Sequence, residues 1–480
     1  MKLKSFITTI FIVLIFFIAT LYFHSETIFA QEAEQLDITI TSPNKNCDKL
    51  QDNSHSTTIS FEAQDTITIT SETAMGGIYV KFNDPVQTWT LSYNDKTEIK
   101  GEYGFLHEYA AFSEDVTSCT ITLDSAMAIS EISAYSKGTL PPDVQLWTKP
   151  CEEQADILVF STHADDEILF LGGVLATYAG QQNLNVQVCY MTNYWDGDRR
   201  REHEKLDGLW ESGVRHYPVN SEFWDKYAES IEGALNYYSY DDVLNYITTQ
   251  VRRFKPMVVV TQDLNGEYGH GGHMLLAKTV CEAVNNSNDT SFCTDSVTSY
   301  GVWDTPKTYL HLYGENKLTM DLRQPLSNMN GRTAVEVAKD AYLKHESQQW
   351  CWFYVSDEYE YSCADFGLYR TTVGNDTSND MLENIVTYEE QAKIKEAEQK
   401  KAEEESRSKE QERLALESKK ASDELKANTN TPSDNSNNKF IIILIIVGFV
   451  FLILVVALFV YKVKIEKKRR KARRKKRLKK

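Results

Sequence analysis

Residues 155–167, ADILVFSTHADDE, decide the fold class of this 480-residue chain. The first eight of them are mostly apolar, which predicts a short buried strand. An apolar stretch of helical length follows at 168–181, and a second strand is expected at 185–192. Strand, helix and strand in this order are typical of a parallel sheet with right-handed crossovers. We therefore predict an α/β fold.

The same alternation continues through the middle of the chain. Helices are expected at 199–213, 240–254 and 334–346, and a further buried strand at 257–262. We place the α/β domain at residues 151–380.

Two polar clusters follow strands of this predicted sheet. Residues 163–167 (HADDE) end the first strand, and the glycine-rich residues 263–273 follow the strand at 257–262. Ligands of open α/β sheets bind outside the carboxyl ends of the strands. The two clusters are therefore expected to form one site.

The two clusters contain the donor set of a divalent metal site. Two imidazoles and one carboxylate hold such a metal and leave positions open for water and substrate, and the candidate ligands are His163, Asp166 and His273. Zn²⁺ held in this way lowers the pKa of its water towards ~7. Asp165 would act as general base, and a protonated His270 would polarise a carbonyl and later protonate a leaving amine. The expected chemistry is metal-assisted amide hydrolysis.

Other interpretations of these residues stay open. Asp165 or Asp166 could cap the helix that begins near residue 168, and His270 and His273 could form a surface pair. Two histidines and a carboxylate also suit Fe²⁺, as in an iron-dependent oxygenase. The adjacent Asp165 base makes hydrolysis the more natural chemistry.

This region resembles the LmbE-like family, also called PIG-L, of zinc-dependent de-N-acetylases. Thr162–Glu167 is similar to the family motif Ala-His-Pro-Asp-Asp-Glu, with Ala164 in place of proline. Gly269–His273 is similar to a Gly-His-x-x-His element, with Gly271 and Gly272 in place of the more usual Pro-Asp. The resemblance extends to an Arg-x-x-Glu pair, Arg201 and Glu204, and to a His-x-x-Gln element at His345–Gln348.

The resemblance implies a Rossmann-like, mostly parallel sheet and a role for each matching residue. In the family, the residues matching His163, Asp166 and His273 bind zinc. Asp165 matches the general base, and His270 matches an acid or oxyanion stabiliser. Arg201 and Asp196 are implied as sugar contacts. The Gly271-Gly272 departure removes a carboxylate that would orient His270.

Residues 33–145 follow a different pattern. Alternating runs rich in Thr, Ile, Val and Tyr, such as 66–70, 77–82 and 117–123, are separated by turn residues. This spacing predicts an all-β sandwich or jelly roll. No catalytic constellation occurs in it, and such modules either bind glycans or act as spacers.

Charge is distributed unevenly along the chain, whose total is −18. Residues 462–480 carry +13 and residues 1–30 carry +1, so residues 31–461 carry −32. A body this acidic argues against nucleic-acid binding by the folded part. The basic tail follows 22 uncharged residues, 440–461, which are long enough for a transmembrane helix. The positive-inside bias then predicts a cytoplasmic tail.

The remaining segments fit an exterior location. Residues 1–30 are typical of a cleaved signal peptide or an uncleaved signal anchor. The eight cysteines all lie between the two membrane segments, either as disulfides of undeducible pairing or as buried free thiols. Residues 386–438 are expected to form a stalk, because 22 of the 38 residues from 389 to 426 are charged and predict an exposed helix before a flexible linker.

Together these features predict a membrane-anchored, extracellular, metal-dependent amidohydrolase. It would use Zn²⁺, with Fe²⁺ as the alternative metal, to remove N-acetyl groups from a glycan or glycoconjugate that contains N-acetylglucosamine (GlcNAc). The alternative is a glycan-binding surface protein with a degenerate enzyme domain.

Overall fold

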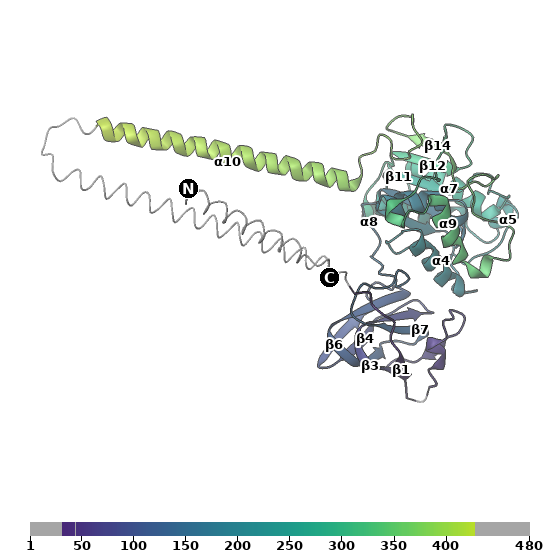
Figure 1. Cartoon of the computed structure of the whole chain (residues 1–480). Coiled ribbons are helices and arrows are strands. Elements are labelled where there is room, and N and C mark those ends of the chain that lie inside the picture. Colours follow the sequence, from purple (N-terminus) through teal and green to yellow (C-terminus); the bar gives the residue numbers. More distant parts are fainter. Residues whose placement is uncertain (1–30, 44, 428–480) are drawn as a thin grey trace, which may run out of the picture. The chain divides into compact units, whose positions relative to one another are not determined.

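The computed structural model describes residues 31–43 and 45–427 (Figure 1). A first compact unit ends at Ala392. It contains two sheets of seven strands each, one all-antiparallel and one mostly parallel.

The first sheet builds the β-module, the name used here for residues 33–145. Its strands are β1 Ile38–Thr41, β2 Ile59–Phe61, β3 Thr66–Phe82, β4 Trp89–Tyr93, β5 Lys96–Lys100, β6 His107–Leu123 and β7 Met127–Tyr135, with a short 3-10 turn η1 at Asp48–Gln51. The order is β2-β7-β3-β6-β4-β5, with β1 beside β3. The all-β prediction is confirmed.

The β-module differs from the predicted sandwich in how its strands connect. Residues 66–70 and 77–82, expected as two strands, belong to the single 17-residue strand β3. Its pairing with β6 shifts register between Thr70 and Gly77. Such irregularities bend a strand. All seven strands, including β3 and β6, belong to one hydrogen-bonded sheet.

The second sheet confirms the predicted mostly parallel α/β architecture. Its strands are β8 Ile157–Ser161, β9 Val186–Tyr190, β10 Val219–Asn220, β11 Val258–Thr261, β12 Lys307–His311, β13 Lys317–Thr319 and β14 Asp365–Thr371, in the order β10-β9-β8-β11-β12-β14-β13. The first five are parallel, and only β14 pairs antiparallel with its neighbours. β8, β9 and β11 are buried throughout, as expected for strands covered on both faces.

Helices surround this sheet (Figure 1). They are α2 Asp166–Leu169, α3 Gly172–Val174, the π-helical turn η2 Leu175–Gln181, α4 Arg200–Glu211, α5 Ile231–Ala234, α6 Tyr240–Phe254, α7 Gly271–Asn286, α8 Thr294–Tyr300, η3 Ser327–Met329, α9 Ala334–Leu343 and η4 Glu346–Gln348. The single helix expected at 168–181 is therefore wrong. Next to the break in this expected helix, α9 approaches closely. A Cβ on Gly172 would lie 2.9 Å from that of Ala338 in α9.

The β-module packs directly against the α/β domain within this unit. The Leu106 amide donates to the Tyr217 hydroxyl at 2.9 Å, and the Phe105 ring stacks on Tyr217 with centroids 4.7 Å apart. Arg199 at the start of α4 forms an ion pair with Asp84. The module is thus in contact with the helix that carries Arg201.

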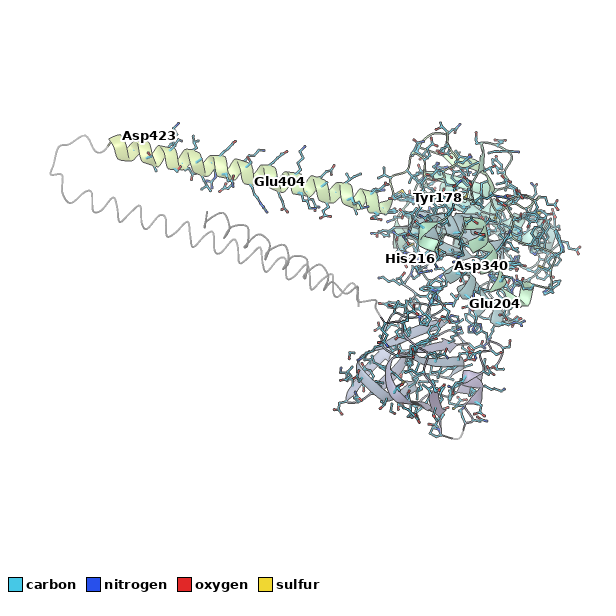
Figure 2. The ribbon with its side chains drawn as sticks, viewed as in Figure 1. Tyr178, Glu204, His216, Asp340, Glu404 and Asp423 are labelled. Carbon is cyan, nitrogen blue, oxygen red and sulfur yellow. The ribbon has the colours of Figure 1, made fainter. Side chains whose placement is uncertain are left out.

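The charged segment before the linker forms one helix, α10 Tyr388–Ala427. Its charged side chains project into solvent, as Glu404 and Asp423 illustrate (Figure 2). Near-neighbour ion pairs such as Lys400–Glu396 at 2.8 Å follow the helix. Among residues 31–43 and 45–427, no helix has the length and apolar character needed to span a bilayer. The predicted segments at 1–30, 428–438, 440–461 and 462–480 lie outside the described residues.

The eight cysteines fall inside the described residues, and each is a free thiol. Six of them are buried and two are partly exposed. Of the two expectations for these residues, the structure therefore favours free thiols over disulfides.

Candidate active site

The predicted site residues meet at the carboxyl ends of two adjacent strands. His163 follows β8, and the loop that leads to His273 follows β11. From β8 the chain builds β9 and β10 on one side and β11 and β12 on the other. The site thus lies at the topological switch point, where α/β sheets place their ligands.

Three side-chain atoms converge tightly there. His163 Nδ1 lies 2.8 Å from Asp166 Oδ2, and His273 Nε2 lies 3.1 Å from each of these atoms. All three residues are buried. A divalent cation takes His and carboxylate donors at roughly 2.0–2.2 Å, and a triangle of this size accommodates it. The donors therefore fit a single ion, with the fourth side left open.

Each of the two candidate histidine ligands has a carboxylate near its opposite ring nitrogen. Glu267 Oε2 lies 2.6 Å from His273 Nδ1, and Asp225 Oδ1 lies 3.2 Å from His163 Nε2. The hydrogen bond to Glu267 fixes the tautomer in which His273 Nε2 presents a lone pair to a metal. The sequence prediction missed both acids. Glu267 stood inside the glycine-rich motif, whereas Asp225 had no sequence signal.

The helix-cap interpretation of the Asp165-Asp166 pair is wrong. Asp165 occupies the N-cap position of α2, but its side chain makes no capping hydrogen bond. The Asp166 carboxylate instead accepts from the backbone amide of His163 at 3.0 Å. Asp165 also has φ 124°, a strained conformation for a residue with a Cβ. In this conformation Asp165 faces Arg201, whereas Asp166 faces His163 and His273.

Arg201 on α4 holds Asp165. Its guanidinium lies 3.0 Å from Asp165 Oδ1 and also donates to the Ala164 carbonyl. Burial raises the pKa of the Asp165 carboxyl, an effect that the Arg201 charge opposes and the Asp166 charge reinforces. A buried carboxyl with a raised pKa is suited to accept and pass on a proton near neutral pH.

His270 begins α7 and is neutral in the structure. Its Nδ1 accepts from the Gly272 amide at 3.0 Å, so the ring proton is on Nε2. Burial and the neighbouring His163 and His273 lower the pKa of His270 to about 2. A Cβ on Gly271 would lie 1.8 Å from the Ser230 carbonyl oxygen. The Gly272 amide thus orients His270 at the place where the family motif has a carboxylate. The close approach of Ser230 requires glycine at position 271.

The Arg-x-x-Glu and His-x-x-Gln elements lie next to the site. Glu204, one turn after Arg201, accepts from the Ser347 amide at 2.7 Å. His345 is fully buried, with Nε2 3.4 Å from Glu167 Oε1. Gln348, by contrast, reaches the cavity above the metal-ligand set. The His-x-x-Gln element therefore supplies one pocket residue and one buried packing residue.

Two adjoining cavities open onto this site. The catalytic pocket, about 520 Å³, is lined by His163, Asp165, Asp166, Leu169, Arg201, Asp225, Tyr227, Tyr268, His270, Gln348, Trp350, Cys351, Trp352 and Phe353. The side pocket, about 360 Å³, is lined by Asn193, Tyr194, Asp196, Gly197, Asp198, Arg201, Trp224, Asp225, Lys226, Gln348 and Trp350. The structure thus brings all but one of the predicted site residues to the catalytic pocket or its ligand triangle. The exception, Asp196, lines the side pocket.

A second histidine cluster joins the β-module to the α/β domain. His55, His107 and His203 bring ring nitrogens within 4.8 Å of one another. However, His203 stacks on both other rings, with interplanar angles of 30° and 28°. His107 Nε2 and His203 Nδ1 share a hydrogen bond at 2.8 Å. Lys81 Nζ also lies 3.0 Å from His55 Nε2. We interpret this cluster as a neutral, hydrogen-bonded stack.

We expect the histidine stack to make the folded protein sensitive to acid. Burial lowers the pKa of His55 to about 4 and those of His107 and His203 well below their ordinary value. The unfolded chain therefore binds more protons than the folded one once the pH falls below ~6.5, and stability is lost from there towards pH ~4. We expect the free energy of unfolding to fall by roughly 2–3 kcal/mol from His55 alone. Chemical denaturation of wild type and His55→Asn at several pH values measures this. Equal slopes in the two proteins would contradict it.

Comparison with known proteins agrees with this geometry. Residues 158–284 match the family model described as PIG-L: GlcNAc-PI de-N-acetylase. The chain contains a PIG-L/LmbE-like domain. The match includes His163, Asp165, Asp166, Arg201, His270 and His273.

Curated relatives cover parts of the chain. A 1D-myo-inositol 2-acetamido-2-deoxy-alpha-D-glucopyranoside deacetylase 1 of Catenulispora acidiphila is 22% identical over 247 residues, which is 43% of this chain and 70% of the relative. A deacetylase of the same description from Geodermatophilus obscurus is 29% identical over 102 residues, which is 21% of this chain and 30% of the relative. Among solved structures, N,N'-diacetylchitobiose deacetylase from Pyrococcus horikoshii is similar with TM-score 0.31 and 17% identity, over 41% of this chain and 71% of that one.

Proposed function

We propose that the protein is a membrane-anchored, extracellular, zinc-dependent de-N-acetylase that acts on a GlcNAc-containing glycan or glycoconjugate. One observation carries the proposal: three candidate donor atoms lie within 3.1 Å of one another, and two of their residues, His163 and Asp166, line one pocket with the Arg201-bound Asp165 and with His270. The relatives' description as deacetylases of acetamido sugars supports the substrate class. The alternative of a degenerate glycan binder has less support because the donor set is complete.

The residues divide the work of amide hydrolysis. His163, Asp166 and His273 would hold Zn²⁺, which when bound supplies a Lewis acid for the acetamide carbonyl and for water. Asp165 takes a proton from the attacking water and later passes it to the leaving amine. The Nε2–H of neutral His270 donates to the carbonyl oxygen as negative charge develops there. This revises the sequence-based expectation that His270 acts in its protonated form.

The location rests on the sequence at both ends of the chain. The signal-like residues 1–30 and the apolar segment 440–461 followed by the basic tail support an exterior catalytic domain and a cytoplasmic C-terminus. The exposed helix α10 would act as a stalk that lets the domain reach a surface polymer. Protease added to intact cells should then release the domain and leave the basic tail cell-bound.

Acetate release tests the activity. Purified protein is assayed on a panel of GlcNAc-containing glycans, before and after a chelator and after Zn²⁺ is restored. We expect release that the chelator abolishes and Zn²⁺ restores. Protein that holds no stoichiometric metal after gentle purification, and releases no acetate with added Zn²⁺ or Fe²⁺, would favour the glycan-binding alternative.

A further inference from the structure

The side pocket adjoins the catalytic pocket but takes no part in the chemistry described above. The two cavities share four lining residues, Arg201, Asp225, Gln348 and Trp350. A group attached to the sugar in the catalytic pocket would therefore extend into the side pocket. Its lining should show what kind of group that is.

The charges of the side pocket oppose an anionic group. Three carboxylates line it, those of Asp196, Asp198 and Asp225. Its two cations both have acidic partners, because Arg201 pairs with Asp165 at 3.0 Å and Lys226 lies 4.0 Å from Asp196. Three carboxylates against two cations leave the lining net negative, which disfavours a phosphate. Neutral hydroxyls, or the ammonium of an amino sugar, suit this lining better.

The polar and aromatic groups of the side pocket suit a sugar ring. Tyr194 is only 5% exposed, and its buried hydroxyl has no hydrogen-bond partner. Trp350 and Trp224 also line the cavity, yet they are 81% and 53% exposed. Large aromatic rings left open beside a cavity mark ligand sites, and such rings stack against the C–H faces of sugars. Hydroxyl recognition and stacking surfaces are thus both present.

We propose that the side pocket is a second sugar subsite, which binds the neutral or amino sugar linked to the GlcNAc being deacetylated. This inference rests on the proposed deacetylase function and narrows its substrate to oligosaccharides or polysaccharides. It places a GlcNAc joined to inositol phosphate among the poor substrates.

Paired substrates test the subsite. We compare kcat/KM for free GlcNAc, N,N'-diacetylchitobiose and a GlcNAc–inositol phosphate, in wild type, Trp224→Ala and Tyr194→Phe. Wild type should favour the disaccharide over free GlcNAc at least tenfold and over the phosphate-bearing substrate by more. Each variant should lose about tenfold on the disaccharide and stay within twofold of wild type on free GlcNAc. Trp352→Ala, which changes the wall of the catalytic pocket alone, is the matched control and should affect both sugars alike.

Binding separates failure of this inference from failure of the proposed function. Isothermal titration of the inactive Asp165→Asn protein with disaccharide should show binding that Trp224→Ala weakens about tenfold, whether or not wild type releases acetate. Equal losses on both sugars, preference for the phosphate-bearing substrate, or disaccharide binding unaffected by Trp224→Ala would each overturn the subsite. Absence of acetate release with Trp224-dependent binding would overturn the deacetylase and leave the subsite.

Discussion

Replacing Asp165 with Asn should lower kcat for acetate release by about 10²–10⁴ while the protein keeps its metal. The substitution preserves size but removes the carboxylate that Arg201 holds beside the candidate metal ligands. Asp166, the neighbouring carboxylate, cannot substitute because its Oδ2 faces both histidine ligands. Steady-state kinetics with metal analysis of the same sample measure both quantities.

The matched control and the pH profile make this test specific. Asp241→Asn removes an exposed carboxylate on α6 and should leave the rate unchanged. In wild type, a base with a raised pKa is lost as the pH falls through that pKa, so the rate should decline on the acid side. Asp165→Asn should lack this acid limb. A variant that retains wild-type activity would refute the mechanism.

The parts of the site that the sequence predicted are those fixed by strand ends. β8 and β11 are short apolar runs that end in polar clusters, and parallel pairing puts both clusters at one sheet edge. For this reason His163 and His273, 110 residues apart in sequence, could be predicted to meet, and they lie 3.1 Å apart. The local sequence pattern was sufficient here because parallel pairing of β8 and β11 places the residues after both strands at the same sheet edge.

The parts that the sequence did not predict depend on long-range contacts. Asp225 lies in a loop without a motif, and its amide donates to the Asn193 carbonyl at 3.0 Å, which sets it beside His163. The neutral state of His270 follows from its burial, which no spacing reveals. The helix expected at 168–181 is interrupted beside α9, where a Cβ on Gly172 would lie 2.9 Å from that of Ala338. Each outcome requires a neighbour that is distant in sequence.

The second large effect concerns the metal ligands and the acid behind them. His273→Ala removes one of three donors and should abolish both stoichiometric Zn²⁺ and acetate release. Glu267→Gln is the more informative change, because Glu267 is fully buried between His273 at 2.6 Å and His311 at 3.0 Å. An amide has only one acceptor oxygen for these two rings. We expect Zn²⁺ affinity to fall about 10–100-fold, as it does when such supporting carboxylates are lost.

Rescue by metal distinguishes this role from simple unfolding. If Glu267 acts by orienting His273, saturating Zn²⁺ should restore much of the acetate release by Glu267→Gln, whereas His273→Ala should stay inactive. Glu232→Gln, an exposed position on α5, should retain wild-type affinity in the same competition titration. An unchanged Zn²⁺ affinity in Glu267→Gln would show that His273 is held by the packing of α7 alone. Because Glu267 also bridges to His311 on β12, the circular-dichroism melting temperature should fall as well, and that fall should persist with Zn²⁺ bound.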